Sequence, residues 1–129
     1  MAQVKIYGLK SHLEANRSAI SSAIHAAIVE ALRYPEEKKF QRFIPLEQEN
    51  FIFPNDRSDR YTIIEISIFE GRSVETGKHL IRLLFQNLEA QAGIAKEDVE
   101  ITIFETPKAN WGIRGVPGDE LSLSYKVEV

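Results

Sequence analysis

The chain of 129 residues contains no cysteine, and it has only one tryptophan and one methionine. The missing thiols exclude disulfide bonds, thiolate nucleophiles and cysteine-ligated metals. No apolar run approaches the roughly 18 residues that a membrane-spanning helix needs, and the first residues lack the basic and apolar segments of a signal peptide. We therefore expect a cytoplasmic protein that is not inserted in a membrane.

Positive charge is not in excess. The chain has 16 lysine and arginine residues and 19 aspartate and glutamate residues, so the formal net charge is -3. A basic surface that attracts nucleic acid nonspecifically is therefore not expected. The 43% hydrophobic and 27% charged fractions are those of an ordinary globular protein. A chain of this length is expected to form one domain over residues 1–129.

The first half has the pattern of a strand, a helix and a second strand. Residues 3–7 alternate polar and apolar side chains, as in a strand with one buried face. A helix of about 20 residues is expected next. Ser11 is expected to cap it, and Pro35 to end it, because the residue before a proline avoids the helical conformation. Residues 40–46 then predict a strand that Pro45 restricts to the edge of a sheet.

The second half repeats this order about 60 residues later. Residues 61–69 form a nearly continuous apolar run, which is typical of a strand in the middle of a sheet. Ser73 is expected to cap the second helix, and Gly93 to supply its left-handed end. Alternating apolar residues predict two further strands at 99–103 and 121–127.

These elements predict two β-α-β repeats, one over about residues 1–60 and the other over about residues 61–129, with parallel strands within each repeat. A pseudo-two-fold axis would relate the repeats in an α/β fold, in which a four-stranded main sheet is backed by two helices. The other face of that sheet would lack cover. We therefore expect a closed oligomer in which the sheets of several copies pack together.

Several motifs resemble the malonate semialdehyde decarboxylase-like group of the tautomerase superfamily. They occur in order over nearly the whole chain: residues 23–32, Tyr34-Pro35-Glu36-Glu37, Phe69-Glu70-Gly71-Arg72-Ser73, Gly93-Ile94 and Asn110-Trp111-Gly112-Ile113-Arg114-Gly115. The resemblance implies the 4-oxalocrotonate tautomerase-like fold, assembly as a homotrimer, and small 2-oxo or 3-oxo acids as substrates. No cofactor is expected.

Position 2 departs from the pattern of that group. The resemblance implies an amino-terminal catalytic proline there after removal of the initiator methionine, whereas this chain has Ala2. Removal of Met1 would leave a primary amine with an ordinary pKa of roughly 7.7 to 8.0. Desolvation and nearby cations would lower that pKa towards neutrality, so Ala2 is the candidate general base. A primary amine is also able to form a Schiff base with a carbonyl compound.

Four further residues are candidates for substrate binding. The resemblance places Arg72 where the decarboxylase holds a substrate carboxylate, and Glu70 where that enzyme has a second arginine. Trp111 and Arg114 offer an aromatic ring and a planar cation that can close over a small acid. The structural alternatives are a salt bridge for Arg72 and packing for Trp111. Lys38 replaces an aspartate that orients a catalytic water in the decarboxylase, so decarboxylation is not expected.

The remaining polar residues have structural interpretations. His12 and His79 lie near the two helix starts without a carboxylate at ligand spacing, so no metal site is expected. Arg42, Arg57 and Arg60 either add positive potential at the mouth of the site or pair with neighbouring carboxylates.

The sequence is compatible with two functions. One is keto-enol tautomerisation of a small 2-oxo acid, with the Ala2 amine as base and Arg72 as carboxylate clamp. The other is a non-catalytic trimer that binds a small carboxylate or has a structural role.

Overall fold

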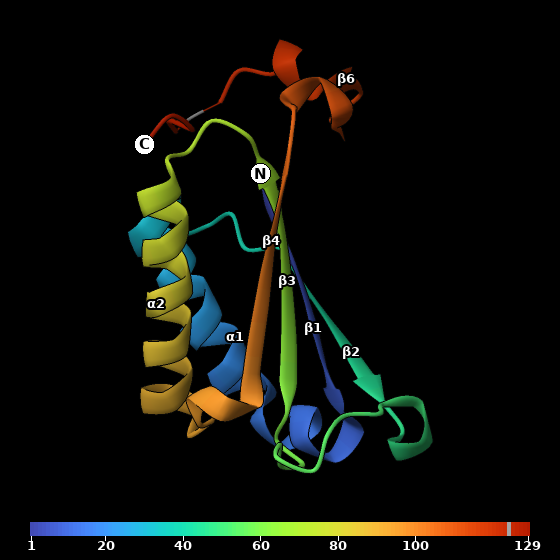
Figure 1. Cartoon of the computed structure of the whole chain (residues 1–129). Coiled ribbons are helices and arrows are strands. Elements are labelled where there is room, and N and C mark those ends of the chain that lie inside the picture. Colours follow the sequence, from blue (N-terminus) through green and yellow to red (C-terminus); the bar gives the residue numbers. More distant parts are fainter. Residues whose placement is uncertain (124) are drawn as a thin grey trace.

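The computed structural model describes residues 1–123 and 125–129, and its main feature is a four-stranded sheet with the order β2-β1-β3-β4. Helices α1 and α2 lie side by side against one face of this sheet (Figure 1). The elements are β1 (Ala2–Leu9), α1 (Lys10–Leu32), β2 (Gln41–Leu46), β3 (Thr62–Phe69), α2 (Val74–Ala92) and β4 (Val99–Thr106). In the described part of the chain, no helix is long and apolar enough to cross a membrane.

The strand pairing confirms the two predicted β-α-β repeats. Strand β1 pairs in parallel with β2, and β3 pairs in parallel with β4. The two repeats meet where β1 and β3 pair antiparallel, with Ala2 opposite Ile68. This register places the start of β1 beside the end of β3, so the amino terminus and the loop after β3 lie at the same end of the sheet.

The core lies between the sheet and the helices. On β1, Val4 and Ile6 are buried and alternate with half-buried residues, as the predicted period of two requires. Strand β3 lies between β1 and β4, which confirms its predicted central place. The helices cover these strands with fully buried apolar side chains, namely Ile20, Ile24 and Ile28 of α1 and Leu80, Leu84 and Leu88 of α2.

The opposite face of the sheet mixes polar and apolar side chains. The Tyr7 hydroxyl donates a hydrogen bond to Glu65 across the β1-β3 pair (2.8 Å). Ile63 is half-buried, and Phe104 is 47% exposed. This face is thus more polar than a core, yet it leaves apolar side chains in contact with solvent.

The helix ends agree with the sequence predictions for α2 and differ for α1. The Ser73 side chain accepts a hydrogen bond from the Thr76 N–H (3.1 Å), and Gly93 has the left-handed conformation with φ of 65°. The predicted cap at Ser11 is wrong, because β1 runs directly into α1 and Lys10 is already helical. No side chain in the described residues caps that helix at Leu9.

The predicted strand over residues 121–127 is also wrong for the residues that the structure describes. After β4 the chain forms a short hairpin of β5 (Gly112–Ile113) and β6 (Val116–Pro117), and residues 121–123 and 125–129 form no strand. Residue 124 lies outside the described residues. The alternating pattern instead reflects side chains that pack on the end of the main sheet, where Val127 is buried and the Val129 carbonyl accepts from the Ser73 N–H (3.1 Å).

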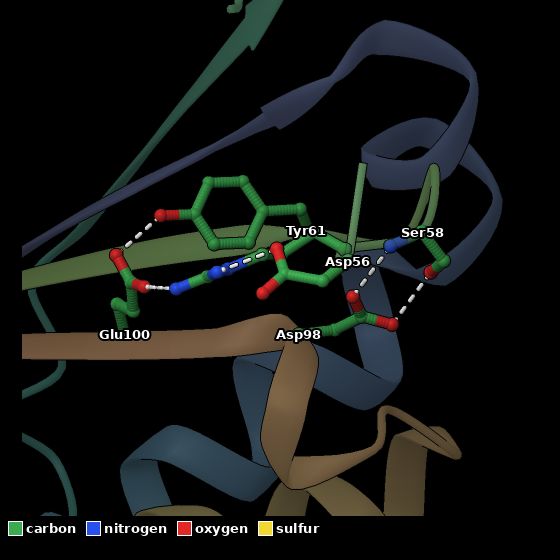
Figure 2. Close-up of polar contacts among 6 residues, drawn as sticks. Asp56, Ser58, Tyr61, Asp98 and Glu100 are labelled. Carbon is green, nitrogen blue, oxygen red and sulfur yellow. Dashed lines mark hydrogen bonds and ion pairs between the residues drawn. The ribbon is translucent and has the colours of Figure 1, made fainter. Parts of the chain in front are cut away.

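Strands β3 and β4 begin at the far end of the sheet, where a polar network ties them together (Figure 2). Arg57 contacts Asp56 (2.7 Å) and Glu100, and the Tyr61 hydroxyl donates to the same Glu100 carboxylate. Arg57 therefore pairs with carboxylates, which is one of the two alternatives left by the sequence.

Asp98 anchors the loop that precedes β3, and its loss is expected to destabilise the fold. Its carboxylate accepts from the Ser58 N–H (2.8 Å) and from the Ser58 hydroxyl (2.5 Å), and Asp98 is 8% exposed (Figure 2). Asp98→Ala leaves both donors without this acceptor and should lower the free energy of unfolding by about 1–3 kcal/mol. Urea denaturation measures this change. The exposed Asp59→Ala is the matched control, and equal losses in both variants would contradict the assignment.

Candidate active site

The amino terminus, the end of β3 and the carboxyl-terminal segment meet at one end of the sheet. Figure 1 shows the amino terminus at the same end as β6 and the carboxyl terminus. The antiparallel β1-β3 register brings Ala2 and Arg72 to this end. The turn after α1 adds Tyr34, and the segment after the β5-β6 hairpin adds Tyr125.

A cavity of about 300 Å³ opens here. Its polar lining includes Met1, Lys38, Arg114, Ser122 and Tyr125, and its apolar lining includes Phe40, Ile113 and Leu121. A volume of this size is at the lower end of the range for small-molecule sites. The structure therefore brings two predicted binding residues, Lys38 and Arg114, to one cavity with the terminal residue.

Two tyrosine hydroxyls hold the first two residues of the chain. The terminal amine of Met1 donates to the Tyr125 hydroxyl, and the Ala2 N–H donates to the Tyr34 hydroxyl (3.0 Å). The two tyrosine rings pack edge to face, with centroids 4.8 Å apart. Ala2 itself is 3% exposed. The nitrogen of residue 2 thus has a fixed place at the inner end of the site.

Arg72 is buried, yet only some of the hydrogen-bond donors of its guanidinium have a partner. It is 8% exposed, and its Nη1 donates to the Phe69 carbonyl (3.2 Å). Its Nε and Nη2 find no hydrogen-bond partner among the described residues. Burial lowers the pKa of the guanidinium from its ordinary value. Because buried charged groups normally have partners, Arg72 is a candidate for binding an anion, and it lies outside the set of residues that line the cavity.

The turn before Arg72 depends on a glycine. Gly71 has φ of 123°, a conformation that residues with a Cβ rarely adopt. A Cβ at this position would also lie 3.2 Å from Val127 Cγ1. Gly71 therefore lets the chain turn beneath the carboxyl-terminal segment and direct Arg72 inward.

The electrostatics of the site favour a neutral amine. Burial, followed by the charges of Arg72, Lys38 and Lys108, lowers the pKa of the Met1 amine from 8.0 to about 5. An amine in this position is therefore largely unprotonated at neutral pH and has a free electron pair.

The pKa values of the Tyr34 and Tyr125 hydroxyls shift in the opposite direction, upwards. Burial raises the pKa of both hydroxyls, and the proximity of Tyr34 raises that of Tyr125 further. Both side chains therefore stay protonated at neutral pH and can donate a hydrogen bond or a proton.

Trp111, a predicted binding residue, is not among the residues that line the cavity. Its ring packs edge-on against Phe69, with centroids 5.1 Å apart, and its Cβ is close to Gly118. Its indole N–H has no partner in the described part of the chain. The structure therefore places Trp111 in the packing of the loop that carries Arg114.

Arg42 and Arg60, which were predicted either to add positive potential at the mouth or to pair with carboxylates, lie elsewhere. Arg42 donates to Gln3 on the sheet edge (3.0 Å), and Arg60 donates to the Ala92 carbonyl at the far end of the sheet (2.7 Å). Within residues 1–123 and 125–129, no three histidine, aspartate or glutamate side chains converge as metal ligands would.

Comparison with known proteins gives a consistent set of relatives. The family model described as tautomerase enzyme matches residues 38–114, which is more than half of the chain. The probable tautomerase YusQ of Bacillus subtilis (strain 168) is 26% identical over 110 residues, which is 78% of this chain and 87% of that protein. The 2-hydroxymuconate tautomerase of Comamonas testosteroni is 39% identical over 57 residues, which is 44% of this chain and 90% of that protein.

Solved structures share the fold. A malonate semialdehyde decarboxylase superposes with a TM-score of 0.81 at 22% identity and covers 92% of this chain and 99% of its own. FG41 malonate semialdehyde decarboxylase inhibited by 3-bromopropiolate gives a TM-score of 0.71 at 28% identity, with coverage of 84% and 86%. A fused 4-OT symmetric trimer gives 0.78 at 20% identity, with coverage of 91% and 96%. These matches confirm the predicted tautomerase-like fold.

Proposed function

The chain belongs to the tautomerase family, and we propose that it catalyses keto-enol tautomerisation of a small 2-oxo acid. In this proposal the general base is the Ala2 amine, which removal of Met1 uncovers. Arg72 binds the substrate carboxylate. The observation that carries the proposal is a cavity for a small ligand at the terminal residue, lined by the cations Lys38 and Arg114 and close enough to the buried Arg72 that its charge lowers the pKa of the terminal amine.

The reaction requires one proton to move between the enol oxygen and the adjacent carbon. A neutral amine takes the proton from the enol hydroxyl and returns it to C3 of the acid. Arg72 holds the carboxylate so that both positions stay within reach of the nitrogen. The hydrogen bond from residue 2 to Tyr34 uses an N–H, and it leaves the electron pair of an uncovered amine free.

Lys38 and Arg114 are proposed to contact the substrate oxygens from the mouth of the cavity. Both line it, and both carry a positive charge. During proton transfer, negative charge develops on the oxygen at C2, which fixed positive groups stabilise. Trp111 supports this step indirectly by packing the Arg114 loop against Phe69.

The pH dependence of the reaction tests the identity of the base. Removal of Met1 would place the amine at the buried residue 2, where we expect burial and nearby cations to lower its pKa below the ordinary value, as they do for the Met1 amine. Since the neutral amine is the active form, kcat/KM for phenylenolpyruvate should rise with pH along an acidic limb and reach a plateau before pH 7. An exposed amine would give a midpoint near its ordinary pKa of about 8.

Lys38→Gln removes one of the cations and should move this midpoint to higher pH. Lys39→Gln is the matched control, because Lys39 is exposed and its charge does not contribute to the shift of the amine pKa. A midpoint near 8 in the unmodified protein would contradict the proposed base.

We further propose that the protein assembles as a homotrimer. The exposed Phe104 and half-buried Ile63 on the open sheet face support an interface there, and the fused 4-OT relative of the same fold is described as a trimer. Light scattering coupled to size-exclusion chromatography measures the mass directly. A monomer at micromolar concentration would contradict this assembly.

Turnover of phenylenolpyruvate by untagged protein, followed through the loss of enol absorbance, tests the proposed function. Turnover that depends on Arg72 supports it. If the protein binds small carboxylates without turning over the enol, the site belongs to a non-catalytic binding protein.

A further inference from the structure

His25 on α1 contacts the segment that holds Lys38 at the cavity. It is half-buried, and its Nε2 donates to the Glu36 carbonyl (2.6 Å). We propose that His25 is a positioning residue, which fixes the segment between α1 and β2 so that the Lys38 side chain stays at the cavity. The inference rests on the proposed function only in that Lys38 has a role at this cavity.

The segment between α1 and β2 has few restraints of its own. Residues 33–40 form neither helix nor strand, and within them the Lys38 N–H donates to the Pro35 carbonyl (3.1 Å). Glu36 lies inside the turn that this bond closes. In the described part of the chain, no other side chain donates to a carbonyl of residues 35–39. The hydrogen bond from His25 therefore ties this turn to the rigid helix α1.

His25 and Lys38 are also close in space. Both line a small gap beside the core, together with Ala2. Lys38 lines the active-site cavity as well, where it is half-buried. A lysine side chain is long and flexible, and its ammonium group is strongly hydrated. If the turn is released from α1, we therefore expect the Lys38 side chain to move away from the cavity into solvent.

The terminal amine reports the position of Lys38. Burial, the charge of Arg72 and then the charges of Lys38 and Lys108 lower the pKa of the Met1 amine, which donates to the Tyr125 hydroxyl. Solvent screens a cation that leaves the cavity, so the protonated amine would become less unfavourable and its pKa would rise. This readout does not require turnover of a substrate.

The pH dependence of acetylation of the terminal amine tests the role of His25. Untagged full-length protein is treated briefly with acetic anhydride at a series of pH values, and modification of the first residue is measured by peptide mapping. We expect His25→Ala to raise the midpoint by about 0.5 pH unit, in the same direction as Lys38→Gln. His25→Gln should restore the midpoint, because its amide can donate to the Glu36 carbonyl. His79→Ala is the matched control, since His79 is exposed on α2.

A double variant separates positioning of Lys38 from a general structural role. In Lys38→Gln protein, His25→Ala should cause no further rise of the midpoint, because the two residues act through one charge. An equal rise with and without Lys38 would overturn the inference. An unchanged midpoint in His25→Ala, or in Lys38→Gln, would overturn it as well.

The outcomes also distinguish this inference from the proposed function. Turnover of phenylenolpyruvate by a protein in which His25→Ala leaves the midpoint unchanged would overturn the role of His25 and leave the tautomerase proposal intact. The expected midpoints without turnover would support the role of His25 and contradict the tautomerase proposal.

Discussion

Replacing Arg72 by methionine is expected to lower kcat/KM for phenylenolpyruvate by about 100-fold or more, because two charge-assisted hydrogen bonds of about 1.5–3 kcal/mol each would be lost. Methionine keeps much of the length of the side chain and removes the charge. Steady-state kinetics with the enol measures the effect. Arg82→Met is the control, since Arg82 is exposed on α2.

The same substitution should leave the thermal unfolding temperature unchanged or raise it. Arg72 is buried with a single hydrogen bond to the Phe69 carbonyl and two unsatisfied nitrogens within the described residues. Removing an unpaired buried charge relieves its desolvation cost, which offsets the lost hydrogen bond. A marked fall in unfolding temperature with unchanged kcat/KM would instead assign Arg72 a structural role.

Blocking the terminal amine is expected to reduce turnover by about 100- to 10,000-fold, the usual contribution of a general base. Acetylation converts the Ala2 amine into an amide, whose nitrogen electron pair is delocalised and no longer accepts the proton. Mass spectrometry confirms the modification, and the enol assay measures the loss.

Ala2→Pro is the matched variant for this experiment. Proline is tolerated at the first residue of a strand and supplies a secondary amine at the same place. We expect the processed variant to keep or gain activity. Undiminished activity in fully acetylated protein would contradict the amine as base.

Much of the fold could be predicted because its signals are local. The alternation in β1, the long apolar run of β3, the Ser73 cap and the left-handed Gly93 each act within a few residues. The repeated order of elements then determined the parallel pairing within each repeat. The Ser11 cap was wrong because β1 leads into α1 without an intervening turn, which no local pattern reveals.

The site could be predicted only in part. Arg72 was found from its motif and from its place between a strand and a helix. Tyr34 and Tyr125 were missed as partners of the amino terminus, because their contacts join residues 32 and 124 positions apart in the chain. Tyr125 alternates with apolar residues as in a strand, and this pattern favoured a packing role over a role as proton donor.

Intact mass spectrometry of untagged protein, followed on the same sample by the phenylenolpyruvate assay, tests the central claim most directly. We expect a mass that lacks Met1, together with turnover that acetylation removes. A free Ala2 amine in folded protein that does not turn over the enol would contradict it.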